Sequence, residues 1–408
     1  MRIRFIPAFG NKYFRILFLI TMFDGLSMVV KAENNDSLKT DNHHIFSFYG
    51  QSGFIMPTNP YYQTNNNRPG TKNRYIGFSF QILEQSTGKY LWEEVYDYPE
   101  YGIGLYGAKF PDNPELGNPV GVYGVFKAPF VRWKKLGLNY EISAGLSGNW
   151  KPFNAEINNY NPSMGMFGTA MIDLGINFNY ELSTHFDIRV GYGITHFSNG
   201  RIKVPNAGLN LNSPKVTLEY YVNRLPRPKE KKVLPVFIRN TAVDISVYGG
   251  RKNVIYMNTG ADTITQYKGV YYNMFGVTSS INRQISYKSR IGIGFTFGYD
   301  GETNSTVGLI NGKLKTNDAF RTDRLTLSAF ASYELVVGHL SMVLQPGFYI
   351  IQKQVPKIKP SVFERIGLKY QFDNNIFTGI SIRAMDLHVA DFIEWSVGYR
   401  FKLLSNSR

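Results

Sequence analysis

Apolar and polar side chains alternate along several stretches of this chain. Between Phe186 and Ser198 the even positions are apolar until the stretch ends on a histidine and a serine, whereas the odd positions are mostly polar or small. The stretches 172–180 and 393–401 repeat this alternation. Because successive side chains of a β-strand point to opposite sides, each stretch predicts a strand with one apolar face.

A soluble sheet with one buried face would show the same alternation. Strand length and the lengths of the connections therefore have to distinguish a soluble sheet from a membrane barrel. Membrane-spanning strands need roughly 9 to 11 residues, and bacterial barrels alternate short turns with long loops. Short turns are expected near 134–137, 182–185, 282–284, 338–339 and 373–375, and long polar connections at 57–73, 149–163, 199–214 and 300–318. We therefore predict an all-β, antiparallel transmembrane β-barrel of roughly 14 to 16 strands.

A Pro-rich, charged segment at 225–235 interrupts the pattern and separates residues 33–224 from residues 236–408. This segment is either an excursion within one large barrel or the boundary between an eight-strand unit and a second sheet. We favour one barrel, in which the C-terminal strands complete the same sheet.

Residues 1–32 have the features of a signal peptide. Four basic residues precede the apolar run ILFLITMF, and VKA ends at Ala32 as a cleavage site. The run is broken at Asp24 and Gly25 and is too short to span a bilayer as a helix. No later stretch is long and apolar enough for a transmembrane helix, so this chain could cross a membrane only as a barrel.

Composition agrees with a barrel and points to an anionic partner. The chain has 28 Tyr and 30 Phe, and transmembrane barrels need aromatic girdles at both interfaces. Its formal charge of +15 stays strongly positive without the signal segment, which suits a phosphorylated lipid. Export and the lack of a nucleic-acid-binding motif argue against nucleic acid. With no cysteine, the protein is neither a disulfide scaffold nor a lipoprotein acylated on cysteine.

His196 and Ser198 end the alternating stretch and share its apolar face. If that face meets lipid, both side chains project outward, and if the first strand ascends from the periplasm, this roughly seventh strand also ascends. The pair then lies at the outer leaflet, under the loop 199–214.

A serine hydroxyl needs a base, which a histidine two residues away can supply. A third polar group must orient the imidazole, and N–H donors must stabilise the oxyanion.

The stretch THFSNGRIKVPNAGLN, residues 195–210, resembles the signature of the lipid A 3-O-deacylase (PagL-like, acyloxyacyl hydrolase) family. These proteins are outer-membrane barrels with a catalytic His-x-Ser, an Asn-Gly or Asn-Ala step and a later Pro-Asn-x-Gly. The resemblance covers residues 120–225, and the C-terminal half, which could complete a wider barrel or bind a partner, lies outside it. It implies that His196 is the base and Ser198 the nucleophile. It also implies that Asn199 and Gly200, together with Asn206, line the oxyanion region.

The sequence differs from that family at the position of the third catalytic residue. Its members typically have a Glu twelve residues after the serine, where this chain has Asn210. A His-Ser-Asn set is similar instead to outer-membrane phospholipase A, and that resemblance implies calcium and a homodimer. We rank the deacylase first because the Pro205-Asn206-x-Gly208 element is the more specific addition. A non-enzymatic porin or adhesin is the third hypothesis.

The two candidates for orienting His196 are Asn210 and Glu219. The alternation in KVTLEYYV points Glu219 into the lumen, opposite a lipid-facing histidine, near Lys215 or Arg189. We therefore expect Asn210, in the loop returning over the site, to orient the imidazole.

Together these observations predict a hydrolase in the outer membrane of a Gram-negative bacterium, an esterase that removes an ester-linked acyl chain from lipid A (lipopolysaccharide). The catalytic set is His196, Ser198 and Asn210. No cofactor is expected, with calcium required only under the phospholipase alternative. The remaining histidines show no metal-ligand spacing, so we expect no metal site.

Overall fold

The computed structural model describes residues 43–57, 73–226, 233–256, 260–316, 320–353, 361–385 and 389–403. The predicted signal peptide, nearly all of the connection 57–73 and the centre of 225–235 lie outside these ranges. Within them the chain is antiparallel β-sheet with short helical turns in the connections. None of the helices in these ranges is both long and apolar enough to cross a membrane.

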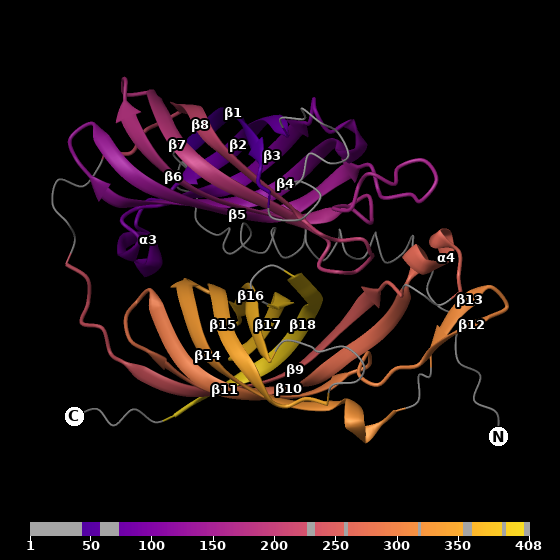
Figure 1. The fold of residues 1–408 in the computed structure, drawn as a ribbon. Helices are drawn as coiled ribbons and strands as arrows, with labels where there is room; N and C mark the ends of the chain where they lie inside the picture. Colours follow the sequence, from indigo (N-terminus) through magenta and orange to yellow (C-terminus); the bar gives the residue numbers. More distant parts are fainter. Residues whose placement is uncertain are drawn as a thin grey trace, which may run out of the picture. The chain divides into compact units, whose positions relative to one another are not determined.

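Two closed barrels account for sixteen strands of the described chain, and Figure 1 shows both. The first barrel consists of β1 (His44–Ile55), β2 (Arg74–Gln85), β3 (Glu100–Lys109), β4 (Gly117–Arg132), β5 (Leu136–Trp150), β6 (Thr169–Glu181), β7 (Phe186–Ser198) and β8 (Leu209–Tyr221). The second consists of β9 (Asn240–Val254), β10 (Val270–Gln284), β11 (Ser289–Asp300), β14 (Leu325–Val337), β15 (Leu340–Ile351), β16 (Val362–Gln371), β17 (Ile376–Met385) and β18 (Val389–Lys402).

The connections carry the remaining elements of the described chain. They are the helices α3 (Leu91–Val95) and α4 (Thr263–Lys268), the 3-10 turns η2 (Pro114–Leu116) and η3 (Thr322–Arg324), and a hairpin of β12 (Val307–Ile310) with β13 (Lys313–Thr316).

The closure of the sheet after eight strands corrects the expectation of one large barrel. Strand β8 pairs back onto β1, with Tyr221 opposite Ile45, and β18 pairs back onto β9, with Tyr399 opposite Ile245. In the sequence, the segment 225–235 thus falls between the last strand of the first barrel and the first strand of the second. The alternation of side chains assigns each residue to a face, but it does not say which strand pairs with the first. Closure depends on strand number and stagger, which leave no mark in the alternation.

The outer surface of each barrel is apolar. Along β1 exposed side chains such as Phe46 and Phe48 alternate with buried ones, and β11 presents Ile293 and Phe295 outward in the same way. An apolar outer band with a polar interior is the pattern of a barrel in lipid.

Short and long connections alternate in the first barrel from β3 onward, whereas the β2–β3 connection, residues 86–99, is a long one at the end of the tight turns. Residues 133–135 and 182–185 make tight turns, whereas 110–116, 151–168 and 199–208 form longer connections at the opposite end. The predicted turn at 182–185 and the seventh position of the strand that carries His196 are therefore confirmed.

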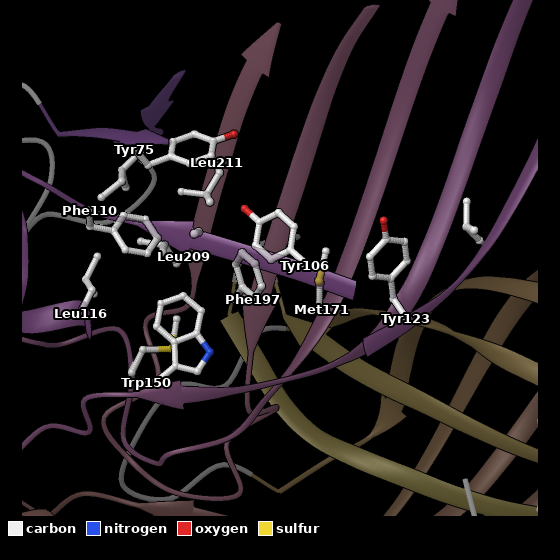
Figure 2. Close-up of a cluster of buried hydrophobic side chains, with 14 of the residues drawn as sticks. Tyr75, Tyr106, Phe110, Leu116, Tyr123, Trp150, Met171, Phe197, Leu209 and Leu211 are labelled. Atoms are coloured by element: carbon white, nitrogen blue, oxygen red, sulfur yellow. The ribbon is translucent and has the colours of Figure 1, made fainter. Parts of the chain in front are cut away.

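Aromatic side chains fill the lumen beneath the end of β7, as Figure 2 shows. Phe197 is fully buried, and its ring centroid lies 5.0 Å from that of Trp150 and 5.9 Å from that of Tyr106. Because Phe197 lies between His196 and Ser198 in sequence, its burial in the lumen turns both neighbours to the outer face. Burial of this ring stabilises the fold and sets the orientation of the strand end.

Candidate active site

The ladder between β7 and β8 brings His196 and Asn210 together. The two residues are direct partners in the antiparallel register, so their side chains lie on the same face of the sheet. Asn210 is the second residue of β8, which corrects the expectation that it lies in the loop. The loop is shorter than expected and comprises residues 199–208, because β8 begins at Leu209.

The imidazole of His196 is held by this cross-strand contact. Its Nδ1 lies 2.6 Å from Oδ1 of Asn210. An amide oxygen only accepts hydrogen bonds, so this contact assigns the proton to Nδ1 and makes Nε2 the proton acceptor. A neutral amide orients the ring without adding a buried charge.

Gly208 borders the same imidazole. Its φ is +70°, in the left-handed region, and a Cβ at this position would lie 3.3 Å from Cε1 of His196. Two features of this position therefore favour glycine: it adopts the left-handed backbone conformation without strain, and its lack of a side chain leaves room for the imidazole ring.

The hydroxyl of Ser198 receives two hydrogen bonds from the loop. The backbone N–H of Gly200 donates to Oγ at 3.1 Å, and Nδ2 of Asn206 donates to it at 3.0 Å. Ser198 is itself almost fully buried. Two donors thus converge on one oxygen atom of a buried side chain.

Asn199 is engaged within the loop. Its backbone N–H donates to Oδ1 of Asn206 at 3.0 Å, and its Nδ2 donates to the carbonyl of Lys203 at 2.8 Å. The first bond fixes the amide of Asn206 so that Nδ2 points to Ser198. Of the three residues expected to line the oxyanion region, Gly200 and Asn206 therefore contact the serine oxygen, and Asn199 positions Asn206.

Glu219 lies on the opposite side of the sheet, as its strand position predicts. It is fully buried in the lumen, where it accepts a hydrogen bond from Nζ of Lys127 at 2.9 Å and another from Nε of Arg189 at 2.6 Å. These two cations neutralise the carboxylate on the lumen side of the sheet, whereas the imidazole lies on the outer face.

Three aromatic residues that were not predicted from the sequence support this site from the lumen. Phe197, Trp150 and Tyr106 hold the end of β7 from the lumen. The only signal was an apolar side chain at the odd position 197, on a face that is otherwise polar or small.

The fold, with an apolar outer face and a polar lumen, defines an outer-membrane β-barrel protein. Residues 75–219 match the family model for lipid A 3-O-deacylase (PagL), and residues 241–403 match the model for the acyloxyacyl hydrolase C-terminal domain. The chain belongs to the lipid A 3-O-deacylase family. It is thus a hydrolase of the outer membrane that acts on an ester of lipid A.

The two family models follow the two barrels. The deacylase match begins in β2 and ends in β8, whereas the C-terminal match runs from β9 to the residue after β18. Membership thus confirms the resemblance drawn from residues 195–210 and extends it to the second barrel.

The chain is remotely similar to several solved outer-membrane structures. The CymD monoaromatic hydrocarbon channel is 9% identical with a TM-score of 0.21, and the match covers 90% of each chain. The siderophore receptor PirA from Pseudomonas aeruginosa is 8% identical with a TM-score of 0.24, over 90% of this chain and 82% of that one. No curated protein matches the chain.

Proposed function

We propose that Ser198, His196 and Asn210 form the catalytic site of this lipid A deacylase, with Ser198 as nucleophile and His196 as general base. The observation that carries the proposal is the pairing of His196 with Asn210 on the outer face, two residues from a serine that receives two hydrogen bonds. Serine ester hydrolysis requires a nucleophile, a base that takes the proton of the nucleophile, and a group that orients the base.

In the first half-reaction Oγ of Ser198 attacks the carbonyl carbon of an ester-linked acyl chain, while Nε2 of His196 takes the hydroxyl proton. The new carbon–oxygen bond forms, and the bond to the lipid A oxygen then breaks. The imidazolium returns its proton to that oxygen, which leaves as a hydroxyl. In the second half-reaction His196 takes a proton from water, the hydroxide attacks the acyl-enzyme, and Ser198 leaves with the proton as the fatty acid is released.

The negative charge that develops on the carbonyl oxygen needs donors already in place. The N–H of Gly200 and Nδ2 of Asn206 both lie about one hydrogen-bond length from Oγ of Ser198. Once Oγ is bonded to the acyl carbon, the carbonyl oxygen is two bonds away from it. A small shift would transfer both donors to that oxygen.

The site opens to the outer leaflet in this proposal. It lies at the end of β7 where the connections are long, and bacterial barrels place their long loops on the extracellular side. Its side chains lie on the same face of β7 as the exposed apolar side chains, with His196 partly buried and Ser198 buried. An acyl chain already in the lipid layer reaches such a site without leaving the membrane.

Mass spectrometry of lipid A and phospholipids tests the proposal in cells that express the wild-type chain or the Ser198→Ala variant. We expect lipid A to lose one ester-linked acyl chain only with the wild-type protein. Accumulation of lysophospholipid with unchanged lipid A would instead support the phospholipase alternative. If the wild-type chain changes neither lipid, the hydrolase proposal fails and a porin or adhesin is favoured.

A further inference from the structure

We infer that the second barrel positions the loop 199–208, which carries the proposed oxyanion donors, and that Asn253 is the principal positioning residue of that barrel. This inference rests on the proposed function of Ser198 and His196. It gives a role to the C-terminal half of the chain, which carries none of the proposed catalytic residues.

Asn253 lies near the end of β9 and is fully buried. Its backbone N–H donates to the carbonyl of Arg201 at 2.9 Å, and its Oδ1 accepts the backbone N–H of Val204 at 3.1 Å. Its Nδ2 donates to the carbonyl of Lys268, the last residue of α4, at 3.2 Å. One side chain thus links the loop 199–208 to the end of a helix in the second barrel's connection.

The second barrel also packs against the backbone of an oxyanion donor. A Cβ on Gly200 would lie 2.3 Å from Cγ1 of Ile393 and 3.6 Å from Cδ1 of Ile382. These two side chains come from β18 and β17. The N–H of Gly200 is one of the two donors to Ser198, so this packing limits the movement of that donor.

An ion pair adds a third contact next to Gly200. Nη1 of Arg201 lies 3.7 Å from Oδ1 of Asp391, and the same oxygen lies 3.0 Å from Nζ of Lys252. Asp391 and Lys252 are both almost fully buried. The loop is thereby tied to a buried charge cluster of the second barrel.

The loop is held from two sides, and the second barrel holds the near part, which directly follows Ser198 in the chain. The first barrel binds the part just before β8, where the N–H of Ala207 donates to the carbonyl of Pro162 at 3.1 Å. The near part receives its bonds from Asn253 at Arg201 and Val204. A buried backbone group without a partner is unfavourable, so loss of these bonds would let the near part shift. Displacement of reacting groups by about 1 Å can cost roughly 100-fold in rate.

The test compares Asn253→Ala with Tyr272→Phe in the full chain refolded in detergent. Tyr272 is a matched control, because its hydroxyl donates to that of Tyr256 in the second barrel and leaves the loop untouched. Two rates are measured: hydrolysis of a short-chain soluble ester, and covalent labelling of Ser198 by a fluorophosphonate. For Asn253→Ala we expect kcat and the labelling rate to fall together, by about 10- to 100-fold, with KM nearly unchanged. Tyr272→Phe should keep both rates.

Two further variants keep the test decisive if Asn253→Ala does not fold. Asn253→Asp retains an acceptor for the N–H of Val204 and should recover part of the labelling rate. Arg201→Gln removes only the ion pair to Asp391 and should lower kcat severalfold.

Labelling of folded Asn253→Ala and Arg201→Gln at the wild-type rate would overturn the inference and leave the proposed function standing. If the wild-type chain hydrolyses no ester and is not labelled at Ser198, the proposed function itself fails.

Discussion

The Nδ1 atom of His196 and the Oδ1 atom of Asn210 lie 2.6 Å apart, directly across the ladder of β7 and β8. Their position within paired strands makes the contact rigid, because the backbone of both residues is held by the sheet. The imidazole is therefore oriented before any substrate arrives. Most catalytic histidines use a carboxylate for this purpose, whereas an amide orients the ring without the cost of burying a charge.

Removal of this contact should slow turnover without unfolding the barrel. For Asn210→Ala we expect kcat to fall by about 10- to 100-fold, because the imidazole loses its preferred tautomer and orientation. Asn210→Glu should keep partial activity, since a carboxylate also accepts the Nδ1 hydrogen. Initial rates on one ester substrate, measured with refolded protein, provide the comparison.

Glu219→Gln is the control for that series. Its carboxylate contacts Lys127 and Arg189 in the lumen and faces away from His196, so the folded variant should turn over at nearly the wild-type rate. An inactive Glu219→Gln together with a nearly normal Asn210→Ala would show that the assignment of the orienting residue is wrong.

Ser198→Ala and His196→Ala should each abolish ester hydrolysis. Loss of a nucleophile or of its base lowers kcat by several orders of magnitude in comparable hydrolases. Both side chains are at a strand end, so the folded barrel should persist, as the shift in gel mobility between heated and unheated samples would show. Retained hydrolysis in either variant would mean that another group performs the reaction.

For the wild-type chain the rate of hydrolysis should fall as the pH is lowered, because a protonated imidazole cannot accept the serine proton.

We expect hydrolysis without any metal. In the proposed mechanism the N–H of Gly200 and Nδ2 of Asn206 stabilise the oxyanion, and no step requires calcium. Treatment with excess EDTA should leave the rate within about twofold of the untreated protein. Loss of activity with the chelator, and its return on adding calcium, would favour the phospholipase alternative, for which calcium is expected.

The sequence predicted the parts of this molecule that depend on local pattern. A period of two placed His196 and Ser198 on one face, and it placed Glu219 on the other. The proposed pairing of His196 with Asn210 also followed from the sequence, through the spacing of the third catalytic position and the similarity of a His-Ser-Asn set to outer-membrane phospholipase A. These features require only strand geometry and the order of residues, both of which can be read from one chain.

The features that the sequence did not predict depend on contacts between distant segments. Closure of β8 onto β1 is a hydrogen-bonding choice among strands with similar alternation. The contacts of Asn253 with the loop 199–208 join residues about 50 positions apart in chain order, and nothing in the pattern around Asn253 marks them. The position of Asn210 in β8 was missed for a local reason, because Asn and Pro near a strand start are typical of loops.

Gly208 offers a test of how closely the imidazole is surrounded. Its φ of +70° is left-handed, and a Cβ added at this position would lie 3.3 Å from Cε1 of His196, so Gly208→Ala should both strain the backbone and displace the ring. The strain alone costs about 1 to 2 kcal/mol. Gly312→Ala is the matched control, since Gly312 has a φ of +67° with no atom within 4 Å of its Cβ position. Both variants should lose similar stability to heat or denaturant, whereas only Gly208→Ala should lose kcat, by about 10-fold or more. Equal activity in the two variants would show that the imidazole has room to move and that Gly208 matters for the backbone alone.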